Sequence, residues 1–572
     1  SGVAFEDASG GAESINDLSD AKTFGTSSIM LGDATTGTID GANYNTALGI
    51  DVFAALTSGD NNTAVGFKAL IGNTTGSGNT AFGKGAGYRI TTGNDNTYLG
   101  HTDDSNAGAA TSSGNTFVGR SAGERNTSGA SNTFIGALCG DLATEGNTNT
   151  GVGSSALTAL TTAANNAAVG ASCMEANTTG TDNVAMGSGA LQANTTASSN
   201  TAIGRAALTA NTTGTRNTAL GELALTGVTT TSDNTAVGYR AMTVAGGEAN
   251  TAVGTQALNA VSGNNNSAVG YQAGVAMGTG HENTLLGTSA GAALTTGYQN
   301  VAVGYQAALN LIGGSGDGKN NVYIGATAGK VQASQEDNTA IGYLALGAGN
   351  STSNSQNTIV GSQAGKAAHA GYGNCYFGYS AGAANTSGIH NSHYGRQAGS
   401  VTTSGGNNLM LGYQAGMSSS PGNVVTGSNV IVLGNNSITN AFIKVDWTVT
   451  SDSRDKTDVA DLDLGLGFIN SLAPKKYKWD MRSDYSDDLS VTPDGTYKKP
   501  QVVAGLLAQD VETLERAAGY KVEEQTNLVV SKDEKGNYGL QYAKLIPILI
   551  KALQEADDKI DALTARVTTL EG

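Results

Sequence analysis

Ser451 and Lys456 are the residues whose types and spacing could support covalent chemistry. A serine hydroxyl is a weak nucleophile until a base removes its proton, and a lysine amine acts as that base only when it is neutral. Burial or a neighbouring cation lowers the pKa of a lysine and so favours the neutral form. The two residues are five apart, so a tight turn could bring the hydroxyl to the amine. Taken alone, a serine and a lysine in an exposed loop are usually just solvated.

Three charged neighbours bear on this pair. Arg454 could depress the pKa of the lysine, or it could orient the strand. Asp452 and Asp455 act in the opposite direction, because a carboxylate stabilises a charged lysine unless it is turned away or paired. The sequence leaves open which of these effects dominates.

Other clusters that could carry chemistry are weak. His390 and His393 are three residues apart with no third ligand evident, so no metal site is expected. The three cysteines are odd in number and far apart, which fits neither a disulfide framework nor a zinc site: Cys139, Cys173 and Cys375. We therefore expect neither a metal nor an organic cofactor.

Composition excludes several classes of protein. The net charge of −17 argues against a nucleic-acid partner, which would need a basic stripe. No apolar run is long enough to span a bilayer, so membrane insertion is not expected. Glycine supplies 82 of the 572 residues, but it does not recur at every third position, which excludes collagen.

A short repeat dominates most of the chain. Its core is Asn-Thr-Ala-Val-Gly or a close variant, as at 217–221, and we call its last residue the register glycine. From Gly32 to Gly434 most successive register glycines are 17 residues apart, and all those from Gly49 to Gly412 have asparagine four positions earlier. A helical pair needs about twice this length, so each unit predicts one coil of a parallel β-solenoid.

Stacked coils place identical side chains above one another. Asparagine amides can then form hydrogen bonds along the stack, and the valine or isoleucine positions form an apolar column. A coil this small has little interior, so one chain would bury too little apolar area to offset its conformational entropy. Association of several chains would supply the missing burial, and we infer a homotrimer.

The composition changes near residue 440, where the charged fraction rises from about 8% to about 30%. A change this sharp marks a domain boundary. We divide the chain into a lead-in segment at 1–31, a shaft of repeats at 32–434, a connector at 435–450 and a C-terminal α+β domain at 451–572.

The last part of this domain predicts a helix from Tyr542 to the end. Its apolar residues alternate spacings of three and four, as in the a and d positions of a coiled coil. We call them the helix seam: Ile546, Leu549, Leu553, Ala556, Ile560, Leu563, Val567 and Leu570. A self-associating coiled coil is the favoured interpretation, and a single amphipathic helix packed on its own domain is the alternative.

Several blocks of this domain resemble the C-terminal intramolecular chaperone of endosialidase-type phage tailspikes and fibres. The blocks are SDSRDK at 451–456, LGLGFINSL at 464–472, YKW at 477–479, GLLAQDVE at 505–512, and YAKLIP with ALQE within 542–555. The repeats of the shaft are similar to the head repeats of trimeric adhesins and to phage fibre shafts. The fold class is therefore mainly β, a trimeric solenoid followed by a small α+β chaperone domain that ends in a coiled-coil helix.

The resemblance implies that the domain trimerises, templates folding of the preceding β-structure and then cuts itself off with a serine-lysine dyad. In this chain the dyad would be Ser451 and Lys456, with Asp452 and Arg454 in supporting positions. The Ser451 hydroxyl can attack the carbonyl of Thr450 and give an ester that water resolves. The predicted cut lies between Thr450 and Ser451. No enzyme activity on other molecules is expected.

The leading interpretation is a trimeric phage tail fibre on the virion that binds a cell-surface glycan or another receptor. Its N-terminus would join other tail or fibre proteins. One alternative is a polysaccharide-degrading tailspike, for which the candidate acids are Asp103, Asp104, Asp317, Glu336 and Asp337. The other is a trimeric adhesin of a bacterial cell surface that uses the same chaperone.

Tyrosines follow several register glycines: Tyr239, Tyr271, Tyr305, Tyr343, Tyr379 and Tyr413. The repeat predicts that they form a packing ladder. A carbohydrate-stacking face is the alternative.

Overall fold

The computed structural model describes residues 21–32, 39, 41–102, 108–244, 246–312, 318–330, 335–347, 355–368, 371–420, 422–444, 448–485, 490–532 and 536–572. The chain divides into two compact units, Ser1–Glu336 and Asp337–Gly572. The first unit consists of solenoid coils. The second contains further coils and the C-terminal region, and each unit is described by itself.

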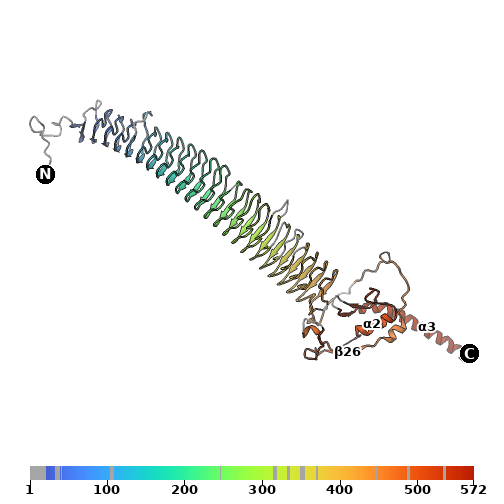
Figure 1. The fold of residues 1–572 in the computed structure, drawn as a ribbon. Helices are drawn as coiled ribbons and strands as arrows, with labels where there is room; N and C mark the ends of the chain where they lie inside the picture. Colours follow the sequence, from blue (N-terminus) through green and yellow to red (C-terminus); the bar gives the residue numbers. More distant parts are fainter. Residues whose placement is uncertain are drawn as a thin grey trace, which may run out of the picture. The chain divides into compact units, whose positions relative to one another are not determined.

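Each coil contributes one strand of three residues, and the strands of successive coils pair in parallel (Figure 1). In the coil that begins at Asn217, strand β13 (Thr218–Leu220) pairs with β14 (Thr235–Val237) at an offset of one repeat. Gly221 follows the strand with a φ of 139°. The predicted parallel β-solenoid with coils of about 17 residues is confirmed.

The strands of the first unit are β1 (Ala21–Phe24), β2 (Ser28–Leu31), β3 (Thr46–Leu48), β4 (Thr63–Val65), β5 (Thr80–Phe82), β6 (Thr97–Leu99), β7 (Thr116–Val118), β8 (Thr133–Ile135), β9 (Thr150–Val152), β10 (Ala167–Val169), β11 (Val184–Met186), β12 (Thr201–Ile203), β13, β14, β15 (Thr251–Val253), β16 (Ser267–Val269), β17 (Thr284–Leu286), β18 (Val301–Val303) and β19 (Val322–Ile324). β1 and β2 form an antiparallel pair, and β2 starts the parallel stack. The coil strands of the second unit are β20 (Thr339–Ile341), β21 (Thr358–Val360), β22 (Cys375–Phe377), β23 (Ser392–Tyr394), β24 (Leu409–Leu411) and β25 (Ile431–Leu433).

The interior of a coil is narrow and lined by small side chains. In the coil of β13 the buried apolar residues are Ala219, Ala224, Leu225 and Val228. Because strand residues alternate between faces, the middle residue of each coil strand, most often alanine, points inward, and its two neighbours point outward. Some coils place Phe117, Phe134 or Tyr323 at this middle position.

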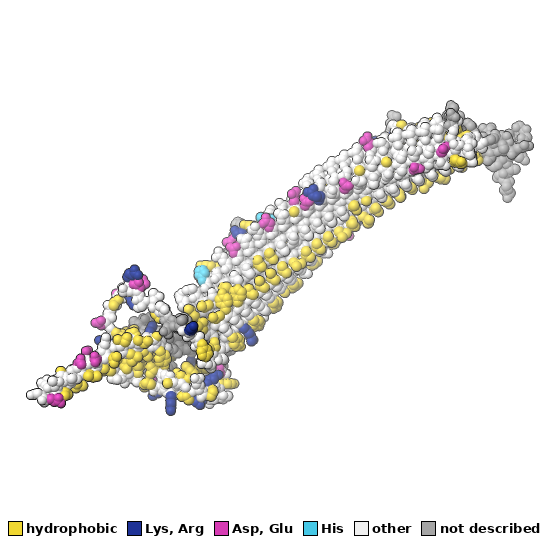
Figure 2. Space-filling view, turned by 180° about the vertical axis from the view of Figure 1, so that it is seen from behind, with side chains coloured by type: hydrophobic (Ala, Val, Ile, Leu, Met, Phe, Trp, Pro, Cys, Tyr) yellow, Lys and Arg dark blue, Asp and Glu magenta, His cyan; other side chains and the backbone are white. Residues whose placement is uncertain are grey.

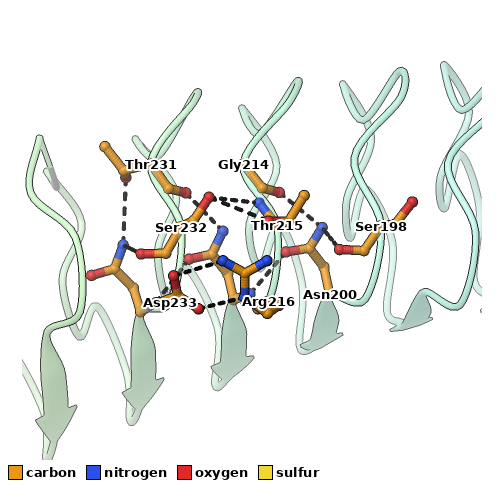
Figure 3. A network of polar contacts seen from close by, with 10 residues as sticks. Ser198, Asn200, Gly214, Thr215, Arg216, Thr231, Ser232 and Asp233 are labelled. Carbon is orange, nitrogen blue, oxygen red and sulfur yellow. Dashed lines mark hydrogen bonds and ion pairs between the residues drawn. The ribbon is translucent and has the colours of Figure 1, made fainter.

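A ladder of buried asparagines links each coil to the next (Figure 3). The backbone N–H of Asn217 donates to Asn200 Oδ1 at 2.9 Å. Asn200 Nδ2 donates to the carbonyl of Gly214 at 3.0 Å, which closes the turn of its own coil. The repeated asparagine therefore satisfies polar groups that would otherwise be buried without a partner. The predicted hydrogen bonding along the stack is confirmed.

The register glycines cannot be replaced without moving the next coil. A Cβ atom at Gly221 would lie 2.5 Å from the carbonyl oxygen of Gly238, and the φ of 139° strains any other residue. We expect Gly221→Ala to destabilise the shaft by about 2 kcal/mol or more, measured as a lower denaturation midpoint. Gly108→Ala is the control, because a Cβ at Gly108 meets no atom within 4 Å. Equal midpoints for the two variants would contradict this account of the register glycine.

The residue before each register glycine lies on the outer face of the sheet (Figure 2). We call these residues the apolar column. Several of its valines and isoleucines are half-buried, and its most exposed members are 36–56% exposed: Leu48, Phe82, Leu99, Ile135, Val169, Met186, Leu220, Val269, Leu286 and Ile324 in the first unit, and Phe377, Tyr394, Leu411 and Leu433 in the second. The predicted column exists, but within one chain it faces outward.

His393 in β23 lies inside the coil, stacked on Tyr376 with ring centroids 4.8 Å apart. Neither ring nitrogen has a hydrogen-bond partner among the described residues. Burial lowers the pKa of His393 to about 3. The unfolded chain takes up this proton near pH 6.5, whereas the folded chain does so only near pH 3, so folding stability is lost as the pH falls through this window.

We expect the stability of the second unit to fall by up to about 1.4 kcal/mol per pH unit below pH 6.5 because of His393. His393→Phe should remove this part of the acid sensitivity, since phenylalanine occupies the equivalent position in β7 and β8. Denaturation midpoints at pH 7 and pH 4 measure the effect. His390→Phe is the control, because His390 is exposed in a turn. An unchanged pH dependence in His393→Phe would contradict the assignment.

The C-terminal region of the second unit combines short helices and strands. Its elements are η2 (Ser453–Asp455), α1 (Leu466–Ser471), β26 (Lys475–Tyr477), η3 (Arg482–Asp484), β27 (Val503–Gly505), α2 (Ala508–Ala517), β28 (Val530–Lys532), β29 (Tyr538–Leu540), η4 (Tyr542–Lys544) and α3 (Leu545–Glu571). β26 pairs with β27, and β28 with β29, both antiparallel. The core contains Leu464, Phe468, Val511, Val529, Val530, Leu545 and Ile548.

Two carboxylates fix these elements to one another. Glu515 of α2 is buried and accepts hydrogen bonds from the backbone N–H groups of Leu528 at 3.0 Å and Val530 at 3.2 Å. Glu555 of α3 accepts the N–H of Leu466 at 2.8 Å, at the start of α1. These bonds satisfy backbone donors that helix and strand ends leave unpaired.

Helix α3 is present as predicted, with η4 forming the turn at Tyr542. It packs on its own domain through Leu545, Ile548 and Ala552. The helix seam uses a different face, and all its members except the half-buried Ala556 are 49–84% exposed. Packing on its own domain therefore accounts for the start of the helix and leaves the seam uncovered. Among the described residues, no helix is long and apolar enough to cross a membrane.

Candidate functional site

The candidate site lies on the short turn η2, at the start of the C-terminal region. Asp452 caps this turn, and its Oδ1 accepts the backbone N–H of Arg454 at 2.9 Å. The backbone N–H of Lys456 donates to the carbonyl of Ser453 at 3.3 Å and ends the turn. Aspartate is a favoured capping residue because its short side chain reaches the free N–H groups of a turn.

This turn brings the two predicted dyad residues together. Lys456 Nζ lies 2.6 Å from Ser451 Oγ and donates to it. The same amine lies 3.4 Å from the carbonyl oxygen of Ser451. A base within hydrogen-bond reach of a serine hydroxyl is the geometry that nucleophilic catalysis requires.

The charged neighbours are engaged with each other. Arg454 Nη2 lies 2.6 Å from Asp452 Oδ2, and Arg454 Nε lies 3.1 Å from Asp452 Oδ1. The Arg454 guanidinium holds the pKa of the Asp452 carboxyl below its usual range, and the Asp452 carboxylate raises the pKa of Arg454. Arg454 and Asp452 are thus paired with each other, and the described contacts of Lys456 are with Ser451 and the backbone of the turn.

Solvent reaches every part of the site in a single chain. Thr450, Ser451 and Lys456 are all exposed. A solvated lysine amine is well stabilised in its charged form, and desolvation is the effect that favours the neutral amine. The contact therefore supplies the geometry of a serine-lysine dyad in a site that is open to solvent.

The other candidate residues are not brought together. His393 lies inside its coil, and His390 lies in an exposed turn against Tyr372. In the described part of the chain, no three histidine, cysteine or acidic side chains form a group that could hold a metal. Burial raises the pKa of the Cys139 and Cys173 thiols to about 12.

Of the acids considered for polysaccharide hydrolysis, only Glu336 and Asp337 lie among the described residues. Asp103, Asp104 and Asp317 lie outside the described residues. Glu336 is engaged by Lys319, whose Nζ lies 3.2 Å from Glu336 Oε2. Glycoside hydrolysis needs two carboxyl groups that face one glycosidic bond.

The tyrosines that follow register glycines are 43–55% exposed. They occupy alternate coils, so one ring does not stack on the next. Within one chain the predicted packing ladder is therefore wrong. The alternation of tyrosine with other residues is visible in the sequence, and it is the signal that could have shown that the rings do not stack.

A model of the family described as chaperone of endosialidase matches residues 451–520. The match begins at Ser451, where the resemblance was predicted to begin, and it confirms the resemblance over this stretch. Neither a curated protein nor a solved structure matches the chain. The protein thus combines a β-solenoid shaft with a C-terminal region similar to endosialidase chaperones.

Proposed function

We propose that the chain is the subunit of a trimeric phage tail fibre that attaches the virion to a cell surface. Its C-terminal domain, 451–572, acts as an intramolecular chaperone and is released by cleavage between Thr450 and Ser451. The observation that carries the proposal is the 2.6 Å contact of Lys456 Nζ with Ser451 Oγ at the first residue of the chaperone match. At that place the serine is a nucleophile next to the peptide bond that it would cut, and the lysine is the base within its reach.

The cleavage can be written from the chain's own atoms. Ser451 Oγ attacks the carbonyl carbon of Thr450 while Lys456 Nζ takes the hydroxyl proton. The C–N bond breaks, the nitrogen of Ser451 becomes a free amine, and an ester joins the Thr450 carbonyl to Ser451 Oγ. Water then hydrolyses the ester, giving the carboxylate of Thr450 and regenerating the hydroxyl.

The apolar column supports association of several chains. Apolar side chains such as Phe82 and Leu220 lie in a row on the outer face of the coils. An extended exposed apolar patch of this kind marks an interaction surface. Burial of the column against copies of itself contributes about 25 cal/mol per Å² of apolar surface. The narrow interior of a coil buries little apolar surface of its own, so this contribution favours association.

The repetition explains why a chaperone is needed. The strands of neighbouring coils have nearly the same residues, so chains that pair one coil out of step keep most of their contacts. Long-range parallel pairing is also slow. A C-terminal trimer would align three chains before the shaft forms, and the finished shaft would persist behind a high barrier to unfolding after the domain leaves.

The mass of the purified particle tests the assembly. We expect native mass spectrometry to give three copies of the shaft chain that ends at Thr450. A stable single-chain shaft would refute the trimer. Binding of labelled particles to a panel of encapsulated bacteria tests attachment, and a particle that binds none of them would refute the adhesive role.

A further inference from the structure

Tyrosine alternates with other residues at the position after the register glycine. From Tyr239 to Tyr413 a tyrosine occupies this position in every second coil, and we call the six residues the tyrosine comb: Tyr239, Tyr271 and Tyr305 in the first unit, and Tyr343, Tyr379 and Tyr413 in the second. The coils between them carry Thr255, Thr288, Ala326, Ser362 and Arg396. A small side chain or an arginine therefore separates successive rings.

This spacing keeps the rings from covering one another. Two coils of a parallel stack span about 10 Å, since neighbouring strands lie about 4.8 Å apart. Rings at that distance do not cover one another. Arg396 fills one of the gaps, with its guanidinium 5.9 Å from the centre of the Tyr379 ring and 5.5 Å from that of Tyr413. The comb thus presents separated aromatic faces with a cation between two of them.

Amide groups lie beside the comb. The residue after the comb position is often glutamine, and Gln272 Nε2 donates to Gln256 Oε1 at 2.9 Å. In the second unit Gln414 Nε2 donates to Gln397 Oε1 at 3.3 Å. These bonds join glutamines of nearby coils in two pairs, and we call the glutamines after the comb position the glutamine row. Their remaining amide donors and acceptors can bind hydroxyl groups of a ligand.

The charge of the second unit's coils differs from that of the rest of the chain. Residues 338–443 contain no aspartate or glutamate, although the whole chain has a net charge of −17. They contain two basic residues, Lys366 and Arg396, and both lie at or near the comb. An anionic ligand would meet favourable charge at this face and repulsion elsewhere.

An open hollow of about 480 Å³ lies beside the comb in the second unit. Small residues such as Gly347, Ala383 and Ala384 line it, and Gln363 and Lys366 supply its polar groups. Leu344, the neighbour of Tyr343 in the chain, also lines it. The hollow therefore combines an apolar wall, an amide and a cation next to exposed aromatic rings.

The geometry points to a binding track for an extended acidic polysaccharide along the tyrosine comb of the second unit. Sugar faces stack on Tyr343 and Tyr379, the glutamine row binds hydroxyl groups, and Lys366 and Arg396 pair with the carboxylates of acidic sugars. This inference rests on the proposed adhesive function and names the chemistry of its ligand.

A copy of the same chain is the less suitable occupant of this face. In a symmetric trimer each basic residue of a face on the axis meets its own copies, and like charges repel. The apolar column, which lacks charge, is the better surface between chains. The comb instead offers aromatic faces, amides and cations together, as sugar-binding sites do.

Retention of the full trimer on immobilised polysaccharides tests the inference. The probes are three acidic polymers, polygalacturonate, alginate and a sialic acid polymer, and neutral dextran. We expect at least one acidic polymer to bind and dextran not to bind. The double variant Tyr343→Ser with Tyr379→Ser should lower the affinity at least tenfold, whereas phenylalanine at both positions should largely preserve it. Lys366→Gln should weaken binding and reduce its dependence on salt.

Arg216→Gln is the matched control, because Arg216 pairs with Asp233 on the surface of the first unit. Failure of all three acidic polymers to bind, or equal binding of dextran, would overturn the inference. Normal binding by the tyrosine variants would also overturn the inference. The same holds if these variants lose binding only because the trimer dissociates. If wild type and the serine variants attach equally well to bacteria, the track is wrong while the adhesive function stands. If wild type attaches to none of the bacteria, the proposed adhesive function itself is wrong.

Discussion

Replacing Ser451 with alanine should leave the chain uncut, as a single band of 572 residues in denaturing electrophoresis. Wild type should instead yield a fragment of about 122 residues, from Ser451 to Gly572. In the proposed cleavage the hydroxyl is the attacking group, and the loss of a nucleophile lowers the rate of such reactions by about a thousandfold or more. Mass spectrometry of the fragment should show Ser451 as its first residue.

Lys456→Ala should have a similar effect, because the amine 2.6 Å from Ser451 Oγ is the only base that the described contacts of this hydroxyl include. Lys444→Ala is the matched control, since Lys444 is an equally exposed lysine before the cut. Cleavage that continues in either dyad variant, or stops in the control, would contradict the assignment. Folding of the uncut variants is checked by their native mass, which should still be that of three chains.

The course of the shaft could be predicted because the repeat is so regular. An asparagine and a glycine that recur at a spacing of about 17 residues indicate a repeated small coil and exclude most other folds. Which strand residue faces inward could not be predicted from hydrophobicity, because Leu220 is more apolar than Ala219 and yet lies outside. The coil is too narrow to hold a large side chain at every level, so in most strands the small residue points inward and the larger one outward.

The contact between Ser451 and Lys456 could be anticipated because the two residues are close in sequence and match a known family. The ion pair of Asp452 with Arg454 could not, because its formation depends on the capping geometry of η2. The exposure of the site could not be predicted either, because burial depends on long-range packing that the local sequence does not indicate.

Leu563→Asp should prevent assembly of the shaft. Leu563 lies in the helix seam, 57% exposed and remote from the core of its own domain, so the single domain should still fold. In a trimeric coiled coil, three leucines would be buried at this level, and their loss costs on the order of 5 kcal/mol per trimer, before the cost of burying carboxylates. Chains that do not align at the C-terminus should aggregate or remain single.

Leu563→Asp should also stay uncut, because the proposed cleavage depends on assembly of the chains. Lys456 is exposed in the single chain, and in the proposed assembly neighbouring chains would cover the dyad, which favours a neutral amine. Ala562→Asp is the control, because it adds the same charge one residue away on an exposed face outside the seam. We expect it to assemble and cleave like wild type. Leu563→Asp chains that form three-chain particles and release the fragment normally would show that the seam does not align the chains.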